Sequence, residues 1–225
     1  AAEAVRLIDL RSHSGAHPRM GVVDVVPFTP IRGVDIAGCA ALAEVTAETM
    51  ASELGIPVYL YEHAARPGRP VSLPAIRKAV GASGCAEPRF DLLAPDYPAP
   101  FDPAKGAAVV GARGPLVAYN VYLRKGGLEH ARKLARIIRD QRGKNRAIAG
   151  VRSLGLYLPS HGLAQVSMNV TRPADTPLPR VFEFVAQAVR DVGGEVGEGE
   201  VIGLVPMVAL SGARPGDTGF EIMKP

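Results

Sequence analysis

Several residue types are scarce or missing in this chain, and each shortage excludes a class of protein. The chain has no tryptophan and only 5% aromatic residues, so aliphatic side chains and alanine must fill its core. Its two cysteines, Cys39 and Cys85, form no CxxC pair, which argues against a disulfide scaffold and makes a reducing cytoplasm the expected compartment. Neither a long uncharged apolar run nor a signal-peptide pattern occurs, so we expect a soluble protein with no membrane partner.

The charge pattern excludes further classes. The net charge is +4, but no Lys/Arg block is interleaved with aromatics, so no nucleic-acid partner is expected. A mildly basic surface suits a small polyanionic ligand. No P-loop, no GxGxxG after a strand, no GxSxG and no paired metal motif is present. With 225 residues, 47% of them hydrophobic, the chain can form one large domain or two small ones.

One short loop is rich in chemically useful side chains. Residues 13–21 read His-Ser-Gly-Ala-His-Pro-Arg-Met-Gly, and a strand-like apolar run follows at once. His13 and His17 are four apart, which on a helix would suit a metal. Pro18 disfavours a helical His17, Gly15 weakens a helix further, and no cysteine or carboxylate cluster completes a shell, so we expect no metal site. A general acid or base at neutral pH and a solvated turn with incidental histidines both remain open.

Hydrophobic periodicity gives a coarse architecture. It predicts helices over 1–10, 34–54, 73–80, 128–141 and 178–192, and strands over 22–31, 58–61, 116–123, 151–158, 164–170 and either 195–197 or 202–205. Residues 81–115 are rich in Gly and Pro and are expected to form an irregular connection that faces the ligand. The second half reads βαββαβ, a ferredoxin-like unit. The fold class is therefore α/β (α+β), with two such subdomains, the first incomplete, and a ligand cleft between them.

Several blocks of sequence are specific enough in their residues to indicate a protein family. Together they resemble the formiminotransferase family, the folate-dependent glutamate formimidoyltransferases, from residue 1 to about residue 210. The blocks are GAHPRMGVVDVVPFTPIRGV at 15–34, IPVYLY at 56–61, LPAIR at 73–77, APDY at 94–97, GAR at 111–113, YN at 119–120, LAQVSMN at 163–169 and GLVP at 203–206.

The resemblance implies a domain organisation and a homodimer. It divides the chain into an N-terminal formiminotransferase subdomain (1–95), a connecting and folate-facing loop (96–115), a C-terminal formiminotransferase subdomain (116–210) and a flexible tail (211–225). Family members carry further strands and a helix before this start, so we expect an N-terminally truncated chain. The strand at 22–31 or at 58–61 is then expected to have an exposed edge.

His17 matches the catalytic histidine of the family. Transfer of a formimidoyl carbon from a glutamate nitrogen to N5 of tetrahydrofolate passes through a tetrahedral intermediate. The attacking amine loses a proton and the departing amine gains one, and one histidine can serve both steps. Nearby, Arg19 is a candidate for a bidentate pair with a substrate carboxylate or for an ion pair with Asp24. Asp24 would orient His17 or pair with Arg19.

Other candidate ligand residues come from later blocks. Residues 98–106 align with the family's folate-contacting loop, where Pro98, Phe101 and Gly106 fit the pattern. Lys105 stands where an aromatic residue often lies and would contact a glutamyl carboxylate. Arg113, in the Gly-Ala-Arg block, is a second carboxylate candidate.

Three polar residues interrupt the apolar strands of the second half. Strand interiors disfavour asparagine, and a buried amide requires partners. Asn120, Gln165 and Asn169 therefore either make structural hydrogen bonds or line the cleft and bind substrate amides or the pterin edge.

The resemblance implies a folate-dependent enzyme of histidine degradation. It would move the formimidoyl group of N-formimidoyl-L-glutamate to tetrahydrofolate, its co-substrate, giving 5-formimidoyltetrahydrofolate and glutamate. Two alternatives stay open. One is formyl transfer from N-formylglutamate, a donor that has an O where the formimidoyl donor has an NH. The other is a non-catalytic remnant that binds folate or another anion.

Overall fold

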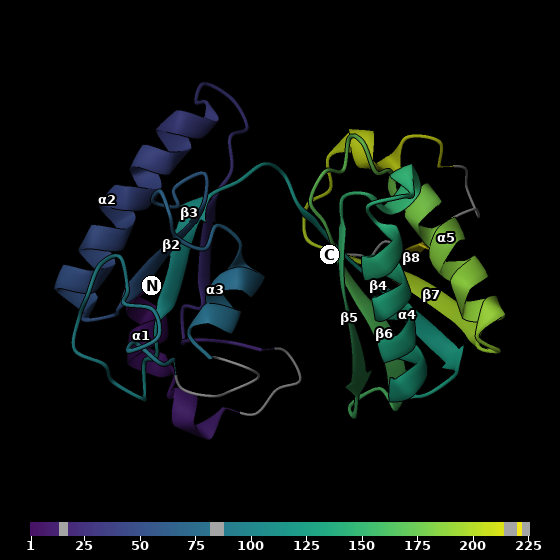
Figure 1. The fold of residues 1–225 in the computed structure, drawn as a ribbon, viewed down its shortest axis with the longest axis horizontal. Coiled ribbons are helices and arrows are strands. Elements are labelled where there is room, and N and C mark those ends of the chain that lie inside the picture. The colour runs from purple at the N-terminus through teal and green to yellow at the C-terminus, as the bar shows by residue number, and fades with distance from the viewer. Residues whose placement is uncertain (14–17, 82–87, 214–219, 222–225) are drawn as a thin grey trace. The chain divides into compact units, whose positions relative to one another are not determined.

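The chain divides into two α/β units, residues 1–114 and 115–225 (Figure 1). The computed structural model describes residues 1–13, 18–81, 88–213 and 220–221. Within that part of the chain, no helix is both long enough and apolar enough to cross a membrane.

The first unit is built on a three-stranded parallel sheet in the order β1-β3-β2. Its helix α2 and the apolar side chains of one sheet face share a core, which includes Ala43, Ala47, Met50 and Leu60. On the other face, α3 packs against the two buried tyrosines of β2. The elements are α1 (Ala2–Leu7), a 3₁₀ turn η1 (Leu10–Ser12), β1 (Val25–Phe28), α2 (Ile36–Leu54), β2 (Val58–Glu62), α3 (Leu73–Ala79) and β3 (Ala108–Ala112).

This sheet differs from the incomplete βαββαβ unit that the sequence predicts. Neighbouring strands of that unit run antiparallel, whereas β3 runs parallel to both of its neighbours. Strands β1 and β2, which lie on either side of β3, therefore also run parallel to each other, and α2 forms the long crossover between them. The central strand β3 also lies inside the segment 81–115 that was expected to be irregular. Its five residues are small or β-branched and all buried, and Gly111 leaves room for the carbonyl of Tyr61.

The limits of the first-unit elements follow from particular residues. Asp35 caps α2 by accepting a hydrogen bond from the Gly38 amide at 2.8 Å, and Gly55 ends the helix in the left-handed conformation. Strand β1 begins at Val25 instead of the predicted residue 22 because Asp24 has a φ of 53°, which breaks the extended backbone, and it ends at Phe28. Pro27 lies in β1, an edge strand of this sheet, where proline is tolerated.

The outer edge of β2 is not exposed, contrary to one of the two expectations. The Val58 amide donates to the carbonyl of Tyr97 at 3.0 Å, and the Leu60 amide donates to the Asp96 carboxylate at 2.9 Å. The Glu62 amide donates to the Val71 carbonyl at 2.6 Å. Asp96 is itself paired with Arg69 at 2.9 Å, so the acceptor that replaces a neighbouring strand is fixed in place.

The second unit has the βαββαβ element order that the sequence predicts. Its antiparallel strands lie in the order β5-β6-β4-β7, and β8 pairs with β7 in parallel. The short strand β8 falls in the segment 211–225 that was expected to be a flexible tail. The elements are β4 (Val117–Lys125), α4 (Leu128–Gln141), η2 (Arg146–Ile148), β5 (Val151–Leu158), β6 (Leu163–Val170), α5 (Leu178–Asp191), β7 (Glu195–Ile202), η3 (Met207–Leu210) and β8 (Phe220–Glu221).

The core of the second unit lies on one face of its sheet. Helices α4 and α5 cover that face (Figure 1). Alternate residues of β4, from Val117 to Leu123, point into this core. The residues between them, Ala118, Asn120 and Tyr122, therefore occupy the opposite face, which is the polar face of the sheet.

Candidate functional site

The loop at residues 13–21, called the histidine loop below, is attached at its C-terminal end to the predicted folate-contacting loop at residues 98–106. His17 itself lies outside the described residues, but residues 18–81, which follow it directly, are described. The Val22 amide donates to the Lys105 carbonyl at 2.9 Å, and the Ala107 amide donates to the Met20 carbonyl at 2.8 Å. Gly21 and Gly106 form an antiparallel bridge. Two segments that are some 85 residues apart in the sequence thus meet beside the loop.

Glycine is required on both sides of this contact. A Cβ atom at Gly21 would lie 2.3 Å from the Ala107 carbonyl oxygen. One at Gly106 would lie 2.2 Å from the Met20 carbonyl oxygen, and Gly106 also has a φ of 72°, which other residues rarely adopt. The backbones can approach this closely only because neither residue has a side chain.

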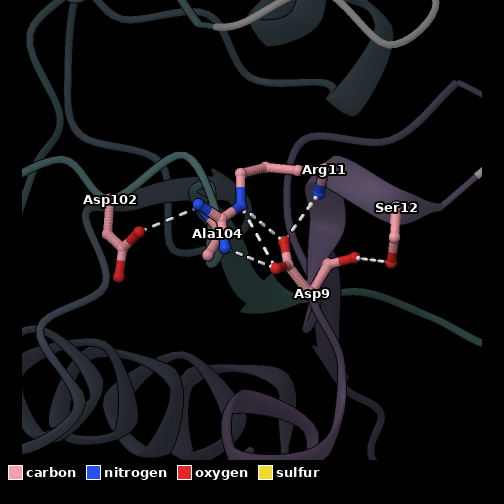
Figure 2. Close-up of polar contacts among 5 residues, drawn as sticks. All are labelled: Asp9, Arg11, Ser12, Asp102 and Ala104. Atoms are coloured by element: carbon pink, nitrogen blue, oxygen red, sulfur yellow. Dashed lines mark hydrogen bonds and ion pairs between the residues drawn. The ribbon is translucent and has the colours of Figure 1, made fainter.

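The entry to the histidine loop is attached to the same segment. The Leu10 amide donates to the Ala104 carbonyl at 2.9 Å. Figure 2 shows the polar groups around this point, where Arg11 pairs with Asp9 and the Ala104 amide donates to the Asp102 carboxylate at 2.9 Å. The side-chain hydrogen bond from Arg11 lowers the pKa of Asp9 to about 2. Both ends of the loop that carries His17 are therefore held by residues 102–107.

Asp24 holds the turn that follows the histidine loop. One carboxylate oxygen accepts a hydrogen bond from the Met20 amide at 2.7 Å, and the other accepts one from the Arg77 guanidinium at 2.8 Å. Arg77 was not predicted to be a site residue, although it ends the Leu-Pro-Ala-Ile-Arg block. Arg19, the partner considered from sequence, donates to the His13 carbonyl at 2.6 Å.

The other first-unit candidates are engaged in local contacts. Phe101 packs edge-on against Phe90, with ring centroids 5.2 Å apart. Lys105 Nζ donates to the carbonyl of Leu54 at 3.1 Å, at the C-terminal end of α2, where a cation is favoured. Arg113 donates to the neighbouring Gly114 carbonyl. The exposed Pro98 follows the bridge between Val58 and Tyr97.

The second-unit candidates share the polar face of their sheet. Asn120 Nδ2 and the Tyr122 hydroxyl both donate to Oε2 of Glu200, at 3.0 and 2.8 Å. Gln165 lies opposite Tyr122 in the register and is 2% exposed, and its buried Oε1 accepts no hydrogen bond from the described residues. Asn169, expected inside an apolar strand, is exposed beside Arg152.

Two residues of this face were missed by the sequence analysis, Tyr122 and Glu200. Burial, followed by the hydrogen bond to Glu200, raises the pKa of Tyr122 to about 12, so the phenol stays a proton donor at neutral pH. The alternation of Glu198 and Glu200 with glycines was the available signal. Nowhere in the described ranges do three or more His, Cys, Asp or Glu side chains gather in a metal-binding arrangement.

Comparison with known protein families decides the relationship. Residues 1–113 match the N-terminal subdomain of the formiminotransferase domain, and residues 118–214 match the formiminotransferase domain that follows it. The chain belongs to the formiminotransferase family. The family predicted from the sequence is thereby confirmed, and both units carry a matched subdomain.

Individual relatives of this chain support the same family assignment. It is 38% identical to the glutamate formimidoyltransferase of Thermoplasma acidophilum over 210 residues, which is 92% of this chain and 68% of that protein. A Streptococcus pyogenes serotype M1 glutamate formimidoyltransferase is 38% identical over 204 residues, 90% of this chain and 67% of that protein. The formimidoyltransferase-cyclodeaminase of Sus scrofa is 40% identical over 93% of this chain, but the match spans only 39% of that longer protein.

Proposed function

We propose that this chain transfers the formimidoyl group of N-formimidoyl-L-glutamate to N5 of tetrahydrofolate, as a step of histidine degradation. The products would be 5-formimidoyltetrahydrofolate and glutamate. The observation that carries the proposal is the 38% identity to a protein named glutamate formimidoyltransferase. The match covers 92% of this chain and 68% of that protein.

The proposed chemistry needs one group that moves a proton between two nitrogens. N5 of tetrahydrofolate attacks the formimidoyl carbon and forms the new C–N bond. His17 takes the N5 proton and returns it to the glutamate nitrogen as the old C–N bond breaks. Support for this role comes from the family match and from the attachment of both ends of the histidine loop to residues 102–107.

Cationic side chains of the first unit suit the carboxylates of both substrates. Arg19 lies two residues after His17, and Lys105 belongs to the segment 102–107 that holds the loop. Arg113 follows the central strand β3. We assign these three residues to carboxylate binding, because guanidinium and ammonium groups make charge-assisted hydrogen bonds to carboxylates. Asp24 is the positioning residue that fixes the turn after His17.

A transfer assay tests the proposed reaction. The purified chain is incubated with N-formimidoyl-L-glutamate and tetrahydrofolate, and glutamate release is measured together with 5-formimidoyltetrahydrofolate. Reactions without tetrahydrofolate, and with N-formylglutamate as the donor, serve as controls. We expect glutamate release only with tetrahydrofolate, and faster with the formimidoyl donor. Faster formyl transfer would contradict the donor assignment, and tetrahydrofolate binding without turnover would favour a non-catalytic remnant.

The family resemblance supports three further assignments. We infer a homodimer, a cytoplasmic location and a ferredoxin-like class for the second unit, whose strand order β5-β6-β4-β7 is that of a split βαβ unit. Sedimentation equilibrium of the purified chain tests the dimer, which predicts a mass of twice 23.6 kDa.

A further inference from the structure

Two hydrogen-bond acceptors on the polar face of the second sheet have no donor in the described residues. The buried Oε1 of Gln165 is one. The other is Oε1 of Glu200, since both donors that reach this carboxylate, from Asn120 and Tyr122, bind Oε2. Gln165 on β6 and Glu200 on β7 lie on either side of Tyr122, which belongs to the strand between them.

A buried amide oxygen without a donor is costly. Leaving such a group unsatisfied destabilises a protein by about 1–3 kcal/mol. Native proteins pair nearly all buried polar groups, and the exceptions need an explanation. A leucine or methionine at position 165 would fill the space without this cost, so packing alone does not account for the glutamine.

The strand pairing beside this group is irregular. The pairing of β4 with β7 shifts between Val121 and Leu123, opposite the two glycines that flank Glu198. A Cβ at Gly199 would lie 2.5 Å from the Tyr119 hydroxyl, so the close approach at this point depends on glycine. Bulges of this kind often occur beside functional sites, where they re-aim a side chain.

The fixed donors and the open acceptors together define the ligand. Asn120 and Tyr122 hold the Glu200 carboxylate in one orientation, at 3.0 and 2.8 Å, and leave one oxygen open. The terminal torsion of a glutamine is soft, so the Gln165 amide can turn toward an incoming group. Two acceptors, one of them anionic, favour a ligand that offers several N–H donors.

We infer that Glu200 and Gln165 form a binding site for a planar N–C–N group that donates hydrogen bonds to both side chains. This inference rests on the proposed function, because both proposed substrates contain such a group. The formimidoyl group is an amidine, and the pterin of tetrahydrofolate has a 2-aminopyrimidinone edge. The site accounts for the glutamine, for the two donors on one carboxylate oxygen and for the irregular strand.

Binding measurements with two probes distinguish which of the two substrates supplies the N–C–N group. Calorimetry compares N-formimidoyl-L-glutamate with 6-methyltetrahydropterin, which lacks the glutamyl tail, on the parent chain and on Glu200→Gln. Gln keeps an oxygen for Asn120 and Tyr122 but removes the negative charge. We expect the Kd of one probe to rise about tenfold or more, as for the loss of a charge-assisted hydrogen bond. A selective loss of pterin binding identifies the pterin edge, and a selective loss of the other probe identifies the amidine.

A neighbouring glutamate provides the matched control. Glu198 is on the same strand, and its side chain and that of Arg124, 3.7 Å away, are both more than 60% exposed. Glu198→Gln should leave both Kd values within about twofold, because exposed ion pairs contribute little. Gln165→Met should fold at least as stably as the parent chain and should weaken the same probe as Glu200→Gln.

The outcomes separate this inference from the proposed function. Unchanged Kd values in Glu200→Gln and Gln165→Met, or a parent chain that binds neither probe, would overturn the site. Turnover of the parent chain is measured in parallel. If the parent chain turns over normally, and if Glu200→Gln and Gln165→Met bind the probes and react as the parent does, the site is disproved and the proposed reaction stands. A chain that shows Glu200-dependent probe binding but no transfer disproves the proposed reaction and leaves the site standing.

Discussion

At the scale of single residues, Asp24 links backbone strain to the histidine loop. A φ of 53° is uncommon for residues other than glycine, although aspartate and asparagine adopt it more often than most, and such backbone conformations often occur at functional sites. The Asp24 carboxylate offsets it by accepting hydrogen bonds from the Met20 amide and from Arg77. The turn just after the loop that carries His17 is fixed by this one side chain.

Substitution of Asp24 should separate the hydrogen bond from the charge. Asp24→Ala leaves the Met20 amide and the Arg77 guanidinium without this acceptor and keeps the unfavourable φ, so we expect it to lower the free energy of unfolding by about 1–3 kcal/mol. Asp24→Asn keeps an oxygen for Met20 and tolerates the left-handed conformation, so its loss should be clearly smaller. Urea denaturation measures both variants, and equal losses would contradict this role of the side-chain oxygen.

Between elements, the contact of the loop exit with residues 105–107 depends on two glycines. An alanine at Gly106 would meet the Met20 carbonyl oxygen at 2.2 Å, a backbone atom that cannot move without breaking the contact. The close approach is therefore a property of the two segments together, and it fixes residues 20–22 beside residues 105–107.

Gly68 is a matched control for Gly106. It has a similar φ of 78°, but a Cβ there would meet nothing within 4 Å. Gly68→Ala should cost only the left-handed backbone penalty, about 1–2 kcal/mol. Gly106→Ala should cost about 2 kcal/mol more, in the range of overpacked sites. Thermal or urea unfolding compares the two variants, and similar losses would show that the close approach is not required.

The sequence predicts some elements much better than others. Helix α4 begins at Leu128 and ends at Gln141, as the apolar stripe predicts, because a periodic helix carries its own signal. Strand β3 carries no such signal, since it has five small or β-branched residues among glycines and prolines. Its central place in a parallel sheet is set by long-range packing against the strands on either side.

The candidate site shows the same division. Arg19 and Asp24 could be named from their sequence blocks, because they lie close to His17. Arg77 could not, since its contact with Asp24 spans 53 residues. Glu200 was missed for the same reason, because it reaches Asn120 across 80 residues. Contacts of this kind follow from sheet register and crossover connections, which local pattern does not specify.

At the scale of the whole molecule, the two matched subdomains account for both units of the chain. Each unit has its own apolar core and its own set of polar candidates. The enzyme and the non-catalytic remnant both predict folate binding, and a ligand present at 100 times its Kd would stabilise either by about 2.7 kcal/mol. Stabilisation by tetrahydrofolate therefore does not distinguish them, whereas turnover does.

The most direct measurement is the turnover of His17→Ala beside the parent chain, with N-formimidoyl-L-glutamate and tetrahydrofolate both saturating. The exposed His63 provides the control substitution, His63→Ala. We predict that His17→Ala lowers turnover by about 10² or more, as for the loss of a general acid–base, while tetrahydrofolate still binds and His63→Ala reacts like the parent chain. Near-normal turnover in His17→Ala would contradict the proposed role of His17.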